Sequence, residues 1–121
     1  MKITDANLAT QKKIFQMQCE ICKSLAHPVR LQIVDRLNQG QTSAADLLRI
    51  LGISKGNLSK HVSLLVRSGV VVSSRRGRQI YYRLTDPEIH KACTIMRTIL
   101  YNKLKLGEKL ASAIRRTEVD P

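Results

Sequence analysis

Segment 43–69 constrains the fold more than any other part of the chain, because it contains two helical patterns joined by a tight turn. The first pattern covers residues 44–51, and either of the two residues before it, Thr42 or Ser43, can cap it, Ser43 with Asp46 three residues on. Gly52 ends this pattern, and Ser54 can cap a second helix that runs to the next glycine. Apolar residues recur at helical spacing along that second helix: Leu58, Val62, Leu65 and Val66. Two helices joined by a three-residue turn with a glycine form the helix-turn-helix pattern.

The flanking sequence adds three helices and a β-hairpin. One helix is expected over about residues 5–26, and the next begins at Pro28. Two β-rich runs at the ends of residues 70–84 enclose a loop with a glycine, which predicts a hairpin. A capping signal then starts a helix over residues 87–106, and Gly107 is expected to end it before a further helical stretch. The fold class predicted is therefore mainly α with a small β-hairpin, a winged helix-turn-helix.

The first and fifth of these helices carry more apolar surface than one core contact needs. Around the helix at 5–26 the apolar residues form two stripes, and around the helix at 87–106 they cover about half of the circumference. We expect the first helix to pack on its own core with one stripe and on a second subunit with the other. The stripes are Ile14, Met17, Ile21 and Leu25, and Leu8, Phe15, Cys19 and Cys22.

The charge of the chain favours a polyanionic partner. Its 121 residues include 21 Lys and Arg against 9 Asp and Glu, a formal net charge of +12. No apolar run approaches the roughly 20 residues of a membrane span. The three cysteines, an odd number without a recognisable signal peptide, are typical of reduced thiols. We therefore expect a cytoplasmic protein without a membrane partner, folded as a single domain over residues 1–121.

The start of the second helix of the motif is polar on one side and apolar on the other. In a helix-turn-helix this helix lies in the DNA major groove, with its first residues near the base edges. Asn57 can pair bidentately with adenine, whereas lysine more commonly contacts phosphate. The DNA contacts expected from this helix are Ser54, Lys55, Asn57, Ser59, Lys60 and His61.

The predicted hairpin has a basic tip. Arg75, Arg76 and Arg78 surround Gly77, and such a tip can lie along the DNA backbone or enter the minor groove, where narrow grooves attract arginine. The chain has few aromatic residues, so it lacks the stacking platforms of single-strand binders. Motif and hairpin together predict binding to double-stranded DNA.

Four segments in combination resemble the ArsR/SmtB family of winged helix-turn-helix repressors. They are Leu25 to Leu31 (LAHPVRL), Ser54 to Leu65, Ser68 to Val71 (SGVV) and Arg78 to Leu84 (RQIYYRL), and the resemblance covers about Leu25 to Leu104. It implies a homodimer built from the helices at 5–26 and 87–106, which represses transcription until an inducer releases it from DNA. A dimer presents two recognition helices about one DNA turn apart, so a near-palindromic operator is expected.

The chain departs from the inducer sites that the resemblance would supply. The thiolate pair of the family's third helix falls at Ser43 and Ala45. Of the family's zinc ligands on the fifth helix, His90 is present, but the positions of the downstream histidine pair are occupied by Tyr101 and Leu104. The cysteine pair of the family's persulfide sensors falls at Asp35 and Tyr101. None of these three sites is therefore expected here.

Cys19, Cys22 and Cys93 remain as candidates for an inducer site. Cys19 and Cys22 are three residues apart and share a helix face, and the resemblance places the first and fifth helices together. Three thiolates suit As(III) or Sb(III), the inducers we expect, whereas His90 as a fourth ligand would suit Zn(II) or Cd(II). The thiols can instead respond to oxidation or persulfide formation, or simply pack in an apolar dimer interface. No obligatory cofactor is expected.

Two functions from other classes stay open. A thiol oxidoreductase would use Cys19 and Cys22, but redox pairs open a helix after a strand and this pair lies late in a predicted helix. A DNA-binding protein without an inducer would differ by its indifference to thiol ligands. The sequence holds no grouping of catalytic residues, so no enzyme is predicted. His27, directly before Pro28, is interpreted as a helix cap or core-edge residue.

Overall fold

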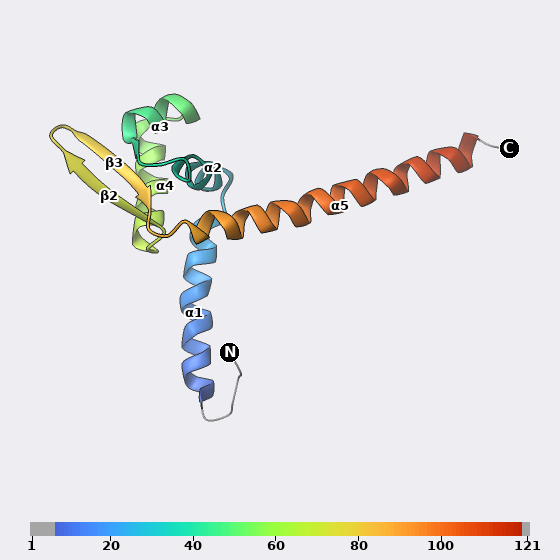
Figure 1. The fold of residues 1–121 in the computed structure, drawn as a ribbon, viewed down its shortest axis with the longest axis horizontal. Helices are drawn as coiled ribbons and strands as arrows, with labels where there is room; N and C mark the ends of the chain where they lie inside the picture. Colours follow the sequence, from blue (N-terminus) through green and yellow to red (C-terminus); the bar gives the residue numbers. More distant parts are fainter. Residues whose placement is uncertain (1–6, 120–121) are drawn as a thin grey trace. The chain divides into compact units, whose positions relative to one another are not determined.

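The computed structural model describes residues 7–119, which divide into two units (Figure 1). The first unit extends to Ile89, and the second begins at His90, the third residue of helix α5. Within the first unit the chain forms α1 (Leu8–Leu25), α2 (Pro28–Leu37), β1 (Thr42–Ser43), α3 (Ala44–Leu51), α4 (Lys55–Arg67), β2 (Val71–Arg76) and β3 (Gln79–Leu84). The helix-turn-helix prediction is confirmed, because α3 and α4 occupy the predicted residues.

The core of the first unit lies between α2, α3, α4 and the sheet. Among the described residues, the buried hydrophobic side chains are Ile33, Val34, Leu37, Leu47, Leu58, Val62, Leu65, Val70, Val71 and Tyr82. The helical ones recur at spacings of three and four residues, so each helix turns one apolar face inward. This packing fixes α4 by its back and leaves its other side to solvent.

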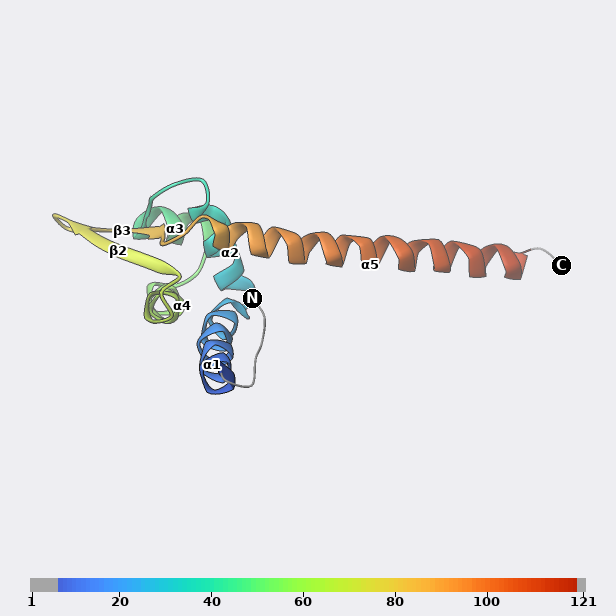
Figure 2. The ribbon, with the colours of Figure 1, turned by 60° about the horizontal axis from the view of Figure 1, so that its bottom comes forward.

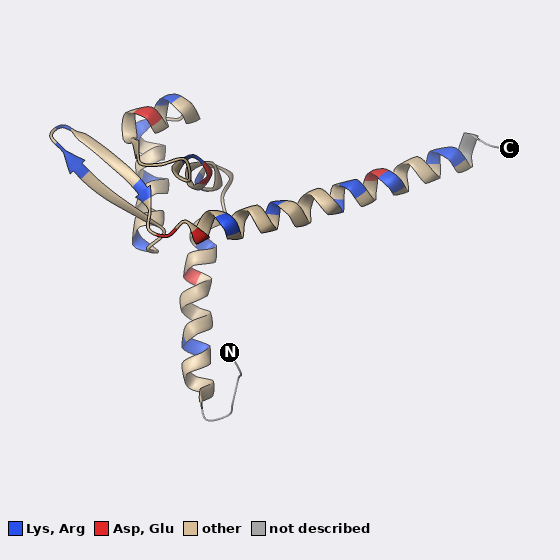
Figure 3. Cartoon of the chain, in the orientation of Figure 1, with Lys and Arg blue, Asp and Glu red and all other residues tan. Residues whose placement is uncertain are grey.

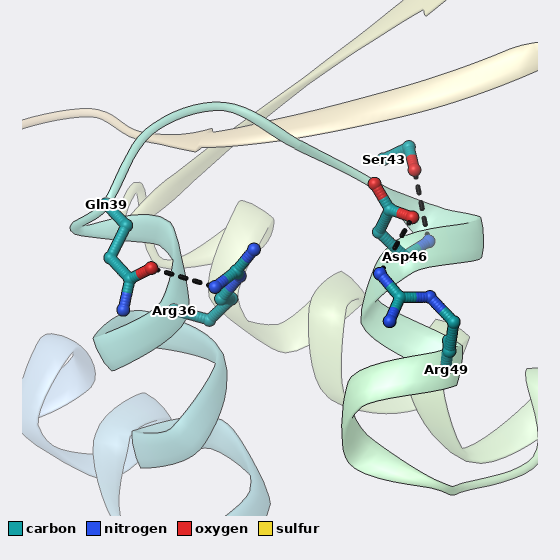
Figure 4. A network of polar contacts seen from close by, with 5 residues as sticks. All are labelled: Arg36, Gln39, Ser43, Asp46 and Arg49. Atoms are coloured by element: carbon teal, nitrogen blue, oxygen red, sulfur yellow. Dashed lines mark hydrogen bonds and ion pairs between the residues drawn. The ribbon is translucent and has the colours of Figure 1, made fainter.

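Side chains cap α3 and α4 at their starts. The Ser43 Oγ accepts a hydrogen bond of 3.0 Å from the Asp46 N–H, and Asp46 also pairs with Arg49 at 3.4 Å (Figure 4). Ser54 accepts an equivalent bond at the start of α4, as described below. Between the two helices Gly52 has a φ of 64°, in the left-handed region that glycine adopts without steric cost. The predicted caps and turn are therefore confirmed.

Helix α2 is fixed at both ends by polar groups. Before Pro28, the His27 Nδ1 accepts a bond of 3.1 Å from the Val29 N–H, which confirms the interpretation of His27 as a cap. At the other end, the Arg36 Nη1 donates to the Gln39 Oε1 at 2.8 Å (Figure 4). The His27 bond satisfies one of the N–H groups that a helix leaves without an intrahelical partner, whereas the bond between Arg36 and Gln39 is an exposed contact between two side chains.

The sheet contains three antiparallel strands in the order β1-β3-β2. Strand β1 pairs Thr42 with Tyr82 and Ser43 with Tyr81. This two-residue strand was not predicted, because it exists only by pairing with a segment about forty residues later and leaves no local pattern. It joins the base of the hairpin to the start of α3.

The predicted hairpin is confirmed, and its strands are longer than the β-rich runs suggested. Arg76 pairs with Gln79, so only Gly77 and Arg78 form the turn, and the strands include the polar residues expected in the loop. Gly77 has a φ of 61°. A glycine with positive φ at the first position of a two-residue turn matches the twist of the flanking strands.

Helix α1 differs from its prediction in what it buries. Its predicted first residues, 5 and 6, lie outside the described part of the chain. The expectation that one of its two apolar stripes packs on the core is wrong, because Ile14 and Ile21 of one stripe are each 40% exposed and Phe15 of the other is 57% exposed. The core is filled by the other elements, and α1 meets α2 and α4 through its C-terminal turns (Figure 1 and Figure 2). Both apolar stripes of α1 are thus largely uncovered in the single chain.

Helix α5 runs without interruption over Glu88–Val119. The expectation that Gly107 ends it is wrong: a glycine inside a helix costs only about 1 kcal/mol, and its neighbours Leu106, Glu108 and Lys109 are good helix formers. At the start of α5 the Asp86 Oδ1 accepts a bond of 2.9 Å from the Glu88 N–H, as the capping signal predicted. Among residues 7–119, no helix has the length and apolar character needed to cross a membrane.

Candidate nucleic-acid interface

Helix α4 presents most of the predicted DNA contacts on its open side. Its buried face is apolar, with Leu65 at 0% and Leu58 and Val62 at 3% exposure. Its exposed residues in the first turns are Lys55, Gly56, Asn57, Ser59 and Lys60. The apolar face holds the helix rigidly, so the exposed polar groups occupy fixed positions for contacts with another molecule.

Ser54 serves first as the cap of α4. Its Oγ accepts a bond of 3.2 Å from the Asn57 N–H. The residue is exposed, and a capping hydroxyl keeps its own hydrogen for donation. A DNA contact by Ser54 stays a prediction.

His61 is placed differently from the other predicted DNA contacts, because it is half-buried. Its Nδ1 lies 3.2 Å from the Arg30 Nη1, and its ring centroid lies 4.3 Å from that of His27. Burial lowers the pKa of His61, and the nearby His27, Arg30 and Lys60 lower it further. A DNA contact by His61 also stays a prediction, and its ring is engaged within the protein.

Arg30 connects three helices through one guanidinium group. Besides His61 on α4, it donates from Nε to the Ser24 carbonyl at 2.6 Å and from Nη2 to the Lys23 carbonyl at 3.4 Å, both near the end of α1. Arg30 itself belongs to α2. This network was not predicted from the sequence, because no local pattern indicates a contact between residues 31 positions apart.

The two faces of the hairpin separate its arginines. Arg75 shares a face with Val71 and Tyr82, the buried side of the sheet. Arg76 lies on the opposite face, with its guanidinium carbon 5.4 Å from the centroid of the Tyr81 ring. Figure 3 shows basic residues near the hairpin turn and along α4.

Arg78 in the turn lines a hollow between α4 and the hairpin. The hollow has a volume of about 370 Å³, and Lys55 and Ser59 contribute from α4. Its remaining lining comes from the start of α3, from the core and from β3: Ser43, Ala44, Ala45, Leu48, Leu58, Gln79, Ile80 and Tyr82. Two cationic residues therefore share a largely apolar hollow whose lining also includes three residues with hydroxyl groups.

The cysteines lie in both units of the chain. Cys19 and Cys22 are exposed on α1, and Cys93 is half-buried on α5. His90 precedes Cys93 by about one helical turn and is also half-buried. Within residues 7–119, the single chain gathers no group of three or more His, Cys, Asp or Glu side chains that could hold a metal ion.

The sequence matches known DNA-binding proteins over this region. Residues 25–74 match a family model described as a helix-turn-helix domain. An uncharacterized helix-turn-helix transcriptional regulator of Mycobacterium tuberculosis is 32% identical over 88 residues, which are 72% of this chain and 77% of the relative. The transcriptional repressor SmtB of the same organism is 35% identical over 75 residues, 62% of this chain and 56% of the relative.

Solved structures share the fold. The crystal structure of the transcriptional repressor BigR from Xylella fastidiosa has a TM-score of 0.66 and 33% identity, and covers 75% of this chain and 93% of its own. A homodimeric winged helix-turn-helix DNA-binding domain of Mycobacterium bovis, described as a possible ArsR-family regulator, has a TM-score of 0.72 over 87% of this chain and 94% of its own. Its identity is 22%, so this second likeness concerns the fold alone.

Proposed function

Because this chain belongs to the ArsR/SmtB family of winged helix-turn-helix transcriptional repressors, we propose that it binds a near-palindromic operator as a cytoplasmic homodimer and is released by a thiol-reactive inducer. α4 enters the major groove and the β2–β3 hairpin reaches the adjacent minor groove or backbone. α1 and α5 form the dimer interface. As(III) or Sb(III) is the inducer.

One observation carries the DNA-binding mode: α4 is held by a buried apolar face and is exposed and polar on the other. Lys55, Asn57, Ser59 and Lys60 stand on that exposed side, where the first residues of a recognition helix meet base edges and phosphates. The basic hairpin lies beside α4 and shares a hollow with it. The net charge of +12 supports affinity for the DNA backbone.

The dimer interface is supported by apolar surface that the single chain leaves open. Phe15 and Met17 on α1 and Met96 and Leu100 on α5 are each more than half exposed. Burial of apolar surface stabilises association. A second copy of this chain presents the same surface, as the symmetric interface of a homodimer requires.

The inducer site is supported by the donor chemistry of Cys19, Cys22 and Cys93. Exposed thiols three residues apart on one helix face can converge on a single soft ion. In a dimer built from α1 and α5, Cys93 from α5 can complete a trigonal thiolate site. His90 is the additional ligand that Zn(II) or Cd(II) would use.

The test is fluorescence anisotropy of reduced protein on duplex DNA from upstream of its own gene, titrated with arsenite. We expect wild-type protein to bind and arsenite to release it, whereas Cys19→Ser and Cys22→Ser bind equally well and stay bound. If arsenite releases the serine variants too, the thiol site is wrong. If arsenite does nothing, release by Zn(II), Cd(II) or the oxidant diamide identifies the alternative inducer, and indifference to all of them indicates cysteines that only pack.

A lysine pair tests the DNA surface with a matched control. Lys60→Ala on α4 should weaken operator binding and reduce the slope of log K against log salt by about one unit, because one phosphate contact is lost. Lys12→Ala, also exposed but on α1, should leave both quantities unchanged. Equal effects from the two variants would remove Lys60 from the interface.

A further inference from the structure

The hollow between α4 and the hairpin is lined by one basic residue from each element. Lys55 belongs to the first turn of α4 and Arg78 to the hairpin turn, yet both line the same hollow of about 370 Å³. Ser59, one turn after Lys55, adds a hydroxyl to it. No carboxylate belongs to the lining of this hollow. A hollow with two cationic residues and no carboxylate in its lining favours an anion.

The geometry of duplex DNA identifies what can lie there. Neighbouring major and minor grooves are separated by one sugar-phosphate strand. When α4 occupies the major groove and the hairpin tip reaches the adjacent minor groove, that strand passes between the two elements. The hollow lies between α4 and the hairpin, so it is where this strand would run.

We propose that Lys55 and Arg78 hold one and the same backbone phosphate of each operator half-site, an assignment that rests on the proposed function. The phosphate oxygens accept from the Lys55 ammonium and from the Arg78 guanidinium, and the Ser59 hydroxyl lies within the same hollow. The half-buried apolar residues of the lining, Leu48 and Ile80, are those that would meet the deoxyribose. α4 and the hairpin thus grip the DNA at one shared point, which fixes the register of the recognition helix.

The neighbouring arginine of the hairpin supplies a matched control. Arg76 is only two residues before Arg78, but its guanidinium lies over the Tyr81 ring on the outer face of the hairpin. It is not part of the lining of the hollow. Arg76 therefore carries the same charge near the same turn without access to the shared phosphate.

The experiment uses full-length protein and a duplex selected from random sequences with the wild type. Single methylphosphonates, which are uncharged, replace the phosphates of one half-site one position at a time. On unmodified duplex, Lys55→Gln and Arg78→Gln should each weaken binding about tenfold, since a charged hydrogen bond is lost. Thermal unfolding should be unchanged in both variants, because both side chains are exposed.

The position of the phosphate decides the proposal. In the wild type, the methylphosphonate at the shared position should lower the binding affinity. This loss of affinity should be smaller in Lys55→Gln and in Arg78→Gln, at the same position in both, and should be absent there when both substitutions are combined. Arg76→Gln should keep the wild-type loss of affinity at that position. If Lys55→Gln and Arg78→Gln map to different phosphates, or to none, the shared-phosphate assignment is wrong although the protein still binds DNA. Wild-type protein that selects no duplex would overturn the proposed function itself.

Discussion

At the scale of single residues, the half-buried His61 gives the fold a pH dependence. Burial and the nearby His27, Arg30 and Lys60 lower the pKa of His61 from its ordinary 6.5, so the unfolded chain binds this proton more readily than the native one. The stability that depends on neutral His61 is therefore complete above pH 6.5 and is lost as the pH falls through 6.5 toward the lowered pKa. Urea unfolding at about pH 7.5 and about pH 5.5 should show a smaller drop for His61→Gln than for the wild type. An equal drop would assign the dependence to other groups.

Also at the residue scale, two contacts drawn in Figure 4 should differ in how much they stabilise the fold, because one is a buried helix cap and the other an exposed ion pair. Ser43 is buried and caps α3 through the Asp46 N–H, so Ser43→Ala should lower the free energy of unfolding by about 1 kcal/mol. Arg49→Ala removes only an ion pair whose side chains are 72% and 54% exposed, and should cost about 0.3 kcal/mol. Chemical denaturation of both variants measures the difference. A larger loss for Arg49→Ala would contradict the assignment of the stability to the cap.

At the scale of elements, the parts with local signals could be predicted and the parts made by long-range contacts could not. Ser43, Gly52 and Ser54 mark the ends of α3 and α4, because caps and left-handed turns are properties of a few neighbouring residues. Strand β1 and the contact between Arg30 and His61 exist only after the chain has folded, so they left no trace in the sequence pattern. The prediction that one apolar stripe of α1 packs on the core was wrong for a related reason. Periodicity shows which face of a helix is apolar, but it does not show what covers that face.

The link between α1 and α4 leads to a prediction at the same scale. Arg30 bonds to the carbonyls of Lys23 and Ser24, which directly follow Cys22, and to His61 on the recognition helix. A ligand that shifts the end of α1 should therefore also shift α4, because the planar guanidinium of Arg30 bonds to both helices. Arg30→Lys keeps the charge and lacks the forked donor, so operator binding should be retained within about threefold while the ratio of operator Kd values with and without arsenite falls. An unchanged ratio by anisotropy would show that the signal takes another route.

At the scale of the whole molecule, the open apolar face of α5 predicts that the chain is incomplete as a monomer. Leu100 is 53% exposed on this face, whereas Thr98 is exposed on the polar side. Leu100→Glu places a charge in the proposed dimer interface at a cost of more than about 2 kcal/mol, so sedimentation should show monomer and operator affinity should fall at least about tenfold. Thr98→Glu should leave the dimer and its affinity intact. Dimers in both variants would place the interface elsewhere.

Helix α5 continues through Gly107 and is about 48 Å long. The side chains before and after the glycine therefore keep a fixed angular relation around one helix axis. Every residue turns the next side chain by about 100°, so the direction of Leu110 and Ile114 depends on the number of residues that separate them from Met96 and Leu100. Two alanines inserted at Gly107 would rotate the later pair by about 200°, whereas four would rotate it by only about 40°. The number of residues between the apolar positions before and after Gly107 is therefore constrained as strongly as their apolar character. Substitutions at Gly107 should be tolerated in evolution more readily than short insertions.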